Sequence, residues 1–532
     1  MSEHSLAEKY KFYELEDEVN ELKRENKSLS IDNSKLKDKI MYYESTKAHK
    51  IWKISNKSHK KNKIKKINEI KVAIISDQFT YDSYKYEFIP IVLTPNNWLK
   101  QFKQECPDIF FCESAWEGCN FKQNEAPWRG KIYENCSTDS ENRGILLEIL
   151  KYCEENDIPT VFWNKEDPPH YKNQYLSFAD TASKFDYIFT SSYECIKHYK
   201  KDYNHPHVYS LLFAAQPKLF NPLNLTEEHI DEVVFAGSYY TNHPERMELM
   251  DYIFDELISR NVKLKIFDRN YHSDWADFPE RFNEYINPSI DYTQTAVVYK
   301  QSDWGLNFNI VTNSQTMFAR RVFELALSYV NIITNFSVGV NKIFKDNVFD
   351  FDKGEIPDFN KNYDEKRLNN LYNVLENHTY KNRWKQILDT IGMEYIDDVD
   401  DIAVIYKIDD LNRLDEFVKN FDDIDYEDKI LKVLLPQDCD VESIKNQYSQ
   451  IDEACFDFDD LNVGSEYFCL LTECIDKDFI KKAILHYQYL NKKVCISQGE
   501  NKFSLGIEEN IENKIINKLN LNHDGQFDVY YI

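Results

Sequence analysis

The chain has 532 residues, enough for several folding units at roughly 100–200 residues per domain. Its formal net charge is −26, from 65 Lys and Arg against 91 Asp and Glu, which argues against nucleic-acid binding because phosphate attracts clustered cations. Hydrophobic residues make up 42%, too many for a disordered chain. No apolar run is long enough to span a bilayer and no apolar signal core opens the chain, so we expect a cytoplasmic protein with reduced thiols.

A seven-residue repeat opens the sequence. Its a positions are Phe12, Val19, Asn26, Asn33 and Ile40, and its d positions are Leu15, Leu22, Leu29, Leu36 and Tyr43. Such a stripe favours a parallel two-stranded coiled coil, with Asn at a selecting the dimer at some cost in stability. We therefore predict that residues 1–48 form a coiled coil that makes the protein a homodimer. A lone surface helix is the alternative.

A basic stretch follows in residues 49–70, which we assign to a linker. The local excess of positive charge over 53–71 comes from lysines, namely Lys53, Lys57, Lys60, Lys61, Lys63, Lys65, Lys66 and Lys71. One hypothesis is a peripheral contact with anionic lipid at the inner face of the membrane. The other is a solvated spacer between the coil and the globular body.

From residue 71 short apolar runs alternate with helical stretches, the pattern of a parallel sheet covered on both faces. In residues 71–215 we expect strands at 72–76, 89–94, 108–112, 160–163, 187–190 and 208–212, and helices at 143–155 and 192–200. In residues 216–395 we expect strands at 232–236, 262–267, 303–308 and 331–334, and helices at 244–260, 317–329 and, as two closing helices, 364–392. Two such Rossmann-like halves would face each other across a cleft at their strand ends.

The alternation begins once more in residues 396–532, which predict a further small α/β domain. Strands are expected at 402–406, 430–435 and 467–472, and helices at 411–421 and 478–490. Residues 350–460 hold 30 acidic and 13 basic side chains, so most of the net negative charge lies around the closing helices and this domain.

Carboxylates follow the predicted strands of the first half. Glu113 comes after one strand, and Glu166 and Asp167 follow another. Because the carboxyl ends of parallel strands border the ligand site, such groups are candidates for a general base that meets an acceptor hydroxyl. The alternative is that Glu166 is a solvated loop charge and that Asp167 caps a turn before Pro168.

The second half has the residue types of an anion site. Gly237 forms a turn between an expected strand and a helix, where backbone N–H groups can meet a phosphate, and Arg246 is available for charge. Asn307 lies near the end of the expected strand 303–308, Ser314 is expected to cap the next helix, and Arg320 and Arg321 would lie in its first turns. Glu324 would be one turn further on, as a ribose ligand or as the partner in an ordinary Arg–Glu pair. No metal-ligand motif occurs, so we expect no metal and no resident cofactor.

These strings together resemble the bacterial glycosyltransferases related to the spore-maturation protein CgeB. The matching runs are Glu113-Ser114-Ala115-Trp116, Pro159 to Pro168, Asp186 to Thr190, Phe235-Ala236-Gly237-Ser238 and Ser314 to Glu324. The resemblance covers about residues 71–345. It implies a GT-B fold, in which the second domain holds the nucleotide-sugar donor, here expected to be a UDP-sugar. Gly237 and Arg321 would then face the diphosphate, Glu324 the ribose, and Glu113, Glu166 and Asp167 the acceptor.

The resemblance implies a metal-independent hexosyltransferase that acts on a hydroxyl of a cell-surface glycopolymer, such as teichoic acid or a polysaccharide, or of a protein. Many retaining GT-B enzymes carry two Glu seven residues apart on the donor helix, and here Thr316 replaces the first, so the stereochemistry stays open. A non-catalytic glycan- or partner-binding scaffold and a nucleotide-sugar epimerase are the alternatives. The last domain resembles, more faintly, a family-2 GT-A glycosyltransferase that lacks its Asp-x-Asp motif at Thr472-Glu473-Cys474.

Overall fold

The computed structural model describes residues 64–532 except 120–125, 138–139, 172, 174, 224, 226–229, 242, 272–277, 399, 500–501 and 521–525. The predicted coiled coil and most of the basic linker therefore lie outside the described residues. The described end of that linker is folded, because β1 (Lys65–Lys66) pairs in parallel with β16 (Tyr395–Ile396), and Ile67 and Ile70 are buried.

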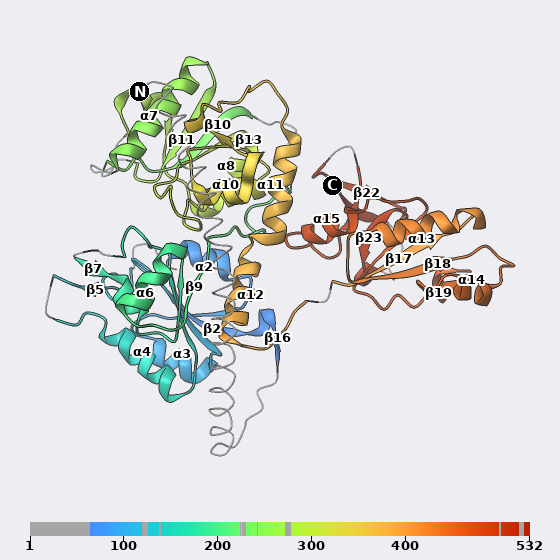
Figure 1. The fold of residues 1–532 in the computed structure, drawn as a ribbon, viewed down its shortest axis with the longest axis horizontal. Helices are drawn as coiled ribbons and strands as arrows, with labels where there is room; N and C mark the ends of the chain where they lie inside the picture. The colour runs from blue at the N-terminus through green and yellow to red at the C-terminus, as the bar shows by residue number, and fades with distance from the viewer. Residues whose placement is uncertain are drawn as a thin grey trace, which may run out of the picture. The chain divides into compact units, whose positions relative to one another are not determined.

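The first half, drawn in blue to teal in Figure 1, is built on a six-stranded parallel sheet. Its strand order is β3-β2-β4-β6-β8-β9. Its strands are β2 (Lys71–Ile75), β3 (Ile89–Val92), β4 (Ile109–Glu113), β6 (Thr160–Asn164), β8 (Tyr187–Thr190) and β9 (Val208–Ser210). All of them coincide with predicted strands. Its helices are α2 (Gln78–Tyr84), α3 (Trp98–Glu105), α4 (Gly144–Glu155), α5 (Phe178–Ala182) and α6 (Ile196–Asp202). A short antiparallel pair, β5 (Glu134–Asn135) and β7 (Leu176–Ser177), flanks it.

The second half repeats the plan with the order β12-β11-β10-β13-β14-β15. Its strands are β10 (Ile230–Gly237), β11 (Lys263–Asp268), β12 (Ile286–Asn287), β13 (Ser302–Asn307), β14 (Asn331–Thr334) and β15 (Phe349–Asp350). Its helices are α7 (Pro244–Ser259), α8 (Tyr292–Gln301), α9 (Arg321–Leu327), α10 (Val338–Phe344) and α11 (Asp364–Asn377). In this sheet the direction of winding reverses between β10 and β13, and in the first half it reverses between β2 and β4. Ligands of doubly wound sheets bind at these switch points.

Alternate residues of each strand enter different cores, as buried parallel strands require. In the first half Ala73 and Phe110 face the core under α3 and α4, whereas Ile74 and Phe111 face the core under α2. Helix α12 (Tyr380–Ile391), which follows α11, packs on this second face. The Tyr84 and Tyr380 rings lie 4.7 Å apart, and those of Phe88 and Trp384 also lie 4.7 Å apart. The chain thus returns to the first half after completing the second.

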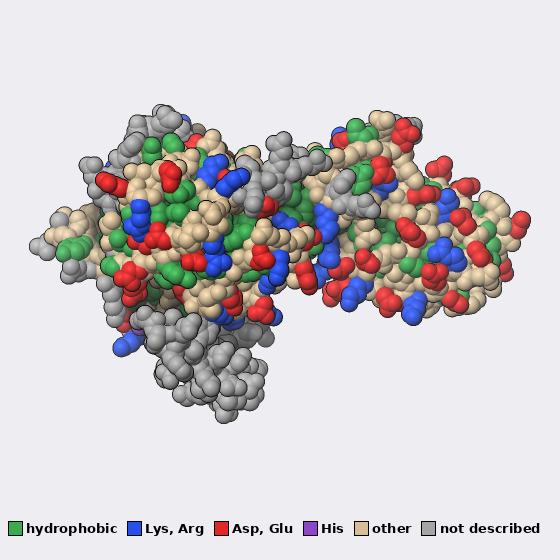
Figure 2. Space-filling view, turned by 90° about the horizontal axis from the view of Figure 1, so that it is seen from above, with side chains coloured by type: hydrophobic (Ala, Val, Ile, Leu, Met, Phe, Trp, Pro, Cys, Tyr) green, Lys and Arg blue, Asp and Glu red, His purple; other side chains and the backbone are tan. Residues whose placement is uncertain are grey.

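The remaining residues form an eight-stranded mixed sheet, in the order β19-β18-β17-β20-β23-β21-β24-β22. Its strands are β17 (Ile402–Lys407), β18 (Lys429–Leu434), β19 (Ile451–Cys455), β20 (Tyr467–Leu471), β21 (Cys495–Ser497), β22 (Leu505–Glu508), β23 (Lys514–Asn517) and β24 (Phe527–Tyr531). Its helices are α13 (Leu414–Asp423), α14 (Val441–Gln447) and α15 (Phe479–His486). Figure 2 shows acidic side chains scattered over the surface of this part.

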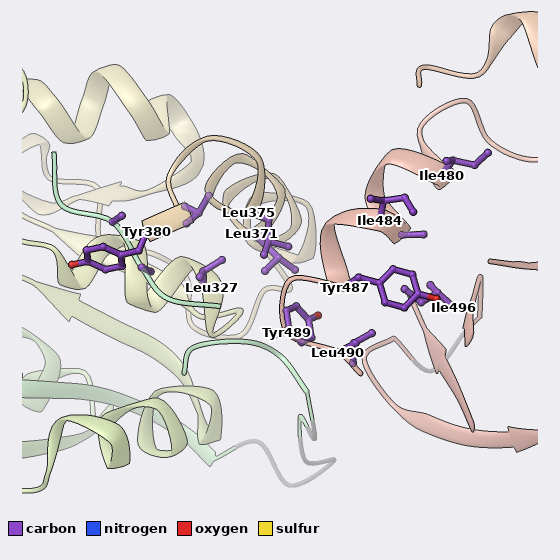
Figure 3. Packing of buried hydrophobic residues seen from close by; sticks show 14 of the residues in the cluster. Leu327, Leu371, Leu375, Tyr380, Ile480, Ile484, Tyr487, Tyr489, Leu490 and Ile496 are labelled. Carbon is purple, nitrogen blue, oxygen red and sulfur yellow. The ribbon is translucent and has the colours of Figure 1, made fainter. Parts of the chain in front are cut away.

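An apolar core joins the third sheet to the second half. Leu371 and Leu375 of α11 and Ile480 and Ile484 of α15 belong to one buried cluster, shown in Figure 3. Polar contacts border it: the hydroxyl of Tyr372 lies 3.1 Å from Nε2 of His486. The core stabilises the junction at about 25 cal/mol per Å² of apolar surface removed from water.

Candidate active site

Two carboxylates and a lysine meet at the switch point of the first sheet. Glu113 ends β4, Asp77 follows β2, and Lys165 follows β6. The Lys165 ammonium donates to Asp77 Oδ2 at 2.9 Å and to Glu113 Oε1 at 3.1 Å. Glu113 also accepts the Asp77 backbone N–H and the hydroxyl of Thr80, both at 2.6 Å. Burial raises the pKa of Glu113 to about 7, Lys165 lowers it and Asp77 raises it.

Asp77 anchors the loop that follows β4. Its carboxylate accepts the backbone N–H groups of Trp116, Glu117 and Gly118 at 3.1, 3.0 and 3.0 Å. Burial opposes its charge, but Lys165 and these N–H groups hold its pKa below the ordinary value. The buried triad of Asp77, Lys165 and Glu113 therefore fixes the loops after β4 and β6 relative to each other.

The three predicted catalytic carboxylates differ in access. Glu113 has no exposed surface and both its oxygens are bonded. Asp167 is also fully buried: it accepts Asn164 Nδ2 at 3.0 Å, the Thr190 hydroxyl at 2.6 Å and the Tyr199 hydroxyl at 3.0 Å. Burial raises the pKa of Asp167 to about 7. Hydrogen bonds thus hold both side chains inside the first half, and the acceptor-facing role expected of them stays a prediction.

Glu166 is the predicted carboxylate that solvent reaches. Its side chain is 23% exposed, and its Oε2 lies 3.9 Å from Nε2 of His170. The Trp116 ring is T-shaped against His170, with the ring centres 5.5 Å apart. This surface of the first half therefore presents a carboxylate, an imidazole and a half-buried indole side by side.

Arginines gather around the switch point of the second sheet. Arg321 begins α9, and its guanidinium bonds the carbonyl of Ala236 and lies 4.7 Å from the Phe235 ring centre. Arg246 of α7 is buried and donates to the Ser238 carbonyl at 2.9 Å. Burial lowers the pKa of Arg246 to about 10, and Arg321 and Arg269 contribute. The predicted anion-site residues Arg246 and Arg321 thus share one site.

Gly237 makes this approach possible. A Cβ on Gly237 would lie 2.6 Å from Cζ of Phe235 and 2.7 Å from Nη2 of Arg321. Within the part of the chain that the structure describes, the buried Nε atoms of Arg246 and Arg321 have no hydrogen-bond partner. Buried donors are normally satisfied, so an unfilled pair beside a glycine turn is typical of an anion site.

Sequence reasoning missed Arg269, which follows β11 directly. The residue keeps exposed surface, yet desolvation lowers the pKa of its guanidinium, and Arg320 and Arg321 lower it further. A third cation therefore borders the site around Gly237.

Arg320 and Glu324 form an ion pair at the i, i+4 spacing of the sequence. Arg320 Nε donates to Glu324 Oε1 at 2.8 Å, and the Tyr292 hydroxyl donates to the same oxygen at 2.9 Å. The Arg320 guanidinium also lies 3.9 Å from the centre of the Phe79 ring. Lys165 Nζ lies 4.2 Å from the same centre, so Phe79 connects the two halves at their switch points.

Ser314 does not cap a helix, because α9 begins at Arg321 rather than at the expected residue 317. Its hydroxyl donates to Glu194 of the first half at 2.6 Å, and the Gln315 N–H donates to Glu194 at 3.0 Å. The Thr316 hydroxyl donates to the Ser191 carbonyl at 2.8 Å. The loop before α9 is thus bonded to the first half.

Asn307 is buried in a network of amides and hydroxyls. Its Nδ2 donates to Asn309 Oδ1 and to Thr334 Oγ1, both at 3.1 Å. Asn309 Oδ1 accepts the Ala319 N–H at 3.0 Å. Asn307 therefore supports the loop that carries the arginines.

The third sheet has a polar end to β20, at Thr472-Glu473-Cys474. The Thr472 N–H donates to Asn513 Oδ1 at 3.0 Å. The resemblance of this domain to a GT-A glycosyltransferase stays a prediction.

Across the described ranges, no group of three or more His, Cys, Asp or Glu side chains is placed to hold a metal. In the same part of the chain no helix has the length and apolarity to cross a membrane.

No family model and no curated protein matches the chain. Similar solved structures include an alpha-glucosyltransferase in complex with UDP, at 11% identity over 61% of this chain and 100% of that one, with a TM-score of 0.40. The Candida albicans trehalose-6-phosphate phosphatase N-terminal domain aligns at 11% identity over 63% of this chain and 99% of that one, TM-score 0.39. TarM aligns at 9% over 48% and 59%, TM-score 0.33. All three TM-scores lie below 0.5, and the strand orders of the sheets define the fold.

Proposed function

We propose that this protein is a glycosyltransferase of the GT-B type that transfers a sugar from a nucleotide-diphosphate donor to a hydroxyl group. The observation that carries the proposal is the set of arginines around Gly237, of which Arg246 and Arg321 have buried, unpartnered Nε atoms. A diphosphate offers the acceptor oxygens that these donors lack, and guanidinium groups bind it bidentately.

In this proposal the arginines stabilise the diphosphate as it leaves. Negative charge grows on the departing oxygen, and donors fixed in advance lower the barrier most when they are shielded from water. Arg320, held by Glu324 and by the Phe79 ring, would sit between the diphosphate and the first half. We further propose that the donor is a UDP-sugar, that a metal is not required, and that the acceptor is a cell-surface glycopolymer or a protein.

The order of the two halves supports this division of labour. The arginines lie in the second half, whereas the accessible Glu166, His170 and Trp116 lie in the first. Each set borders the switch point or strand ends of its own sheet, where doubly wound folds bind ligands. An indole offers a face on which a sugar ring can pack, which suits the acceptor side.

The test is a panel of nucleotide sugars, scored by thermal shift and by slow hydrolysis. We expect UDP and at least one UDP-sugar to raise the melting temperature and one donor to be hydrolysed. A free sugar with inverted C2 would indicate an epimerase instead. If no nucleotide shifts the melting temperature and none is hydrolysed, the protein is a non-catalytic scaffold.

A further inference from the structure

Glu166 and His170 form a carboxylate–imidazole pair on one turn of chain after β6. The His170 backbone N–H donates to the Glu166 carbonyl at 3.1 Å, which sets both side chains on the same side of the turn. Nε2 of His170 lies 3.9 Å from Oε2 of Glu166, and the imidazole is 36% exposed. The imidazole is therefore the more exposed of the two groups, and a substrate can reach it.

The buried triad holds this pair in place. Lys165 precedes Glu166 and is tied to Asp77 and Glu113, and its backbone N–H donates to the Ser114 hydroxyl at 3.0 Å. On the other side of the imidazole, the backbone N–H of Trp116 donates to Asp77, and the Trp116 ring contacts the His170 ring. The imidazole thus rests on a rigid support, as a group that must meet a reacting atom requires.

His170 also approaches the second half. His243 precedes α7, three residues before Arg246, and burial lowers its pKa, with Arg246 and His170 lowering it further. His170 is therefore near enough to His243 for their charges to interact across the junction.

We propose that His170 is the general base of the transfer and that Glu166 is its positioning residue; this inference rests on the proposed function. Glu113 and Asp167, the other carboxylates considered for that task, are fully buried and bonded. Nδ1 of His170 lies 3.4 Å from Nδ2 of Asn173, a long contact that an acceptor hydroxyl can replace. With the imidazole proton on Nε2, the side that faces the Glu166 carboxylate at 3.9 Å, the Nδ1 lone pair is left for the acceptor's proton.

The step balances as a single displacement. The acceptor O–H bond breaks and its proton passes to His170 Nδ1, while the acceptor oxygen bonds to the anomeric carbon. The bond from that carbon to the diphosphate oxygen breaks, and its electron pair leaves with the diphosphate beside the arginines. Attack from the opposite side inverts the anomeric configuration. Glu166 stabilises the imidazolium that forms, as a carboxylate does in other base pairs of this kind.

The experiment measures hydrolysis of the UDP-sugar that the panel identifies, with water as the acceptor. His170→Gln should lower kcat by about 10²–10⁴-fold with UDP affinity unchanged, because a positioned base contributes on that order. The acid limb of the pH–kcat profile, which reports protonation of the base, should disappear. Glu166→Gln should lower kcat by a smaller factor and alter the same limb. His198→Gln, at a first-half histidine packed on Tyr171, is the matched control.

The outcomes separate this inference from the proposed function. Hydrolysis by His170→Gln within about threefold of wild type, with the acid limb intact, would overturn the base assignment while the transferase stands. A product that retains the donor's anomeric configuration, read by NMR before mutarotation, would overturn it as well. If Glu166→Gln leaves the profile unchanged, the positioning role is wrong. If wild type binds no nucleotide, the proposed function fails first.

Discussion

The guanidinium carbon of Arg320 lies 3.9 Å from the centre of the Phe79 ring, and this contact joins the N-terminal end of α9 in the second half to α2 in the first half. Lys165 lies over the same ring at 4.2 Å. A single aromatic side chain therefore contacts both Lys165 of the buried triad and Arg320 of the second half.

Replacing Phe79 with leucine should weaken this connection. The leucine keeps apolar contact but lacks the ring face, so we expect a loss of about 0.5–2 kcal/mol in the free energy of unfolding. We also expect lower turnover, because the Arg320 guanidinium loses the aromatic ring against which it packs. Phe79→Tyr keeps the face and is the control. Equal melting temperatures and equal turnover for the two variants would show that the contact has no such role.

Replacing Lys165 with methionine should lower the free energy of unfolding, because the buried carboxylates of Asp77 and Glu113 lose their cation. Removing one member of a buried ionic group costs about 3–5 kcal/mol. Burial holds the pKa of Glu113 near 7, above its unfolded value, so its contribution to stability is greatest at low pH and is lost as pH rises toward 7. Urea unfolding of Lys165→Met should therefore show a larger deficit at pH 8 than at pH 5.

The control for that series is Lys151→Met, at an exposed lysine 3.9 Å from Glu155. An exposed pair of this kind contributes little, so its unfolding should match wild type at both pH values. A Lys165→Met deficit that is the same at pH 5 and pH 8 would contradict the coupling between Lys165 and Glu113.

His486, between α11 and the third sheet, should make the protein sensitive to acid. Burial lowers its pKa to about 3, whereas the unfolded chain takes up the proton near 6.5. Stability is therefore unaffected above pH 6.5 and falls below it, by up to about 1.4 kcal/mol per pH unit. His486→Gln should reduce this slope between pH 6.5 and 4 in urea unfolding. An unchanged slope would mean that His486 is protonated in the folded state.

Much of the fold could be predicted because buried parallel strands are continuous apolar runs. The strand at 187–190 and the strand at 331–334 have the predicted bounds. Helix α2 was missed because Gln78–Tyr84 mixes polar and aromatic residues without a clear helical period, and Asp77 and Thr80 were missed with it. The start of α9 was predicted four residues early, because Ser314 resembles a helix cap while its hydroxyl bonds another part of the chain.

The candidate site was predicted in outline and corrected in detail. Residues that follow strands are easy to list, but the direction in which each side chain points depends on hydrogen-bond partners that are distant in sequence. Asp167 and Glu166 are neighbours, yet Thr190 and Tyr199 draw the first inward and leave the second accessible. Asp77 directly follows the predicted strand 72–76, and Arg269 lies two residues after the predicted strand 262–267, so a search of the residues just beyond every strand end would have found both.

The predicted coiled coil lies outside the described residues and has its own test. Deleting residues 1–48 should convert a dimer into a monomer in multi-angle light scattering, with the melting temperature of the remaining chain unchanged. The physical reason is that the apolar seam at the a and d positions is the proposed dimer contact. A dimer that persists after the deletion would place the contact elsewhere.

Calorimetric titration with UDP measures whether the arginines around Gly237 bind a nucleotide diphosphate. Wild type should bind UDP, Arg321→Ala should weaken binding by at least about tenfold, equal to about 1.4 kcal/mol, and Arg260→Ala, at an exposed arginine paired with Glu256, should match wild type. No binding at millimolar UDP, or equal affinity for Arg321→Ala and wild type, would show that these arginines do not form a diphosphate site.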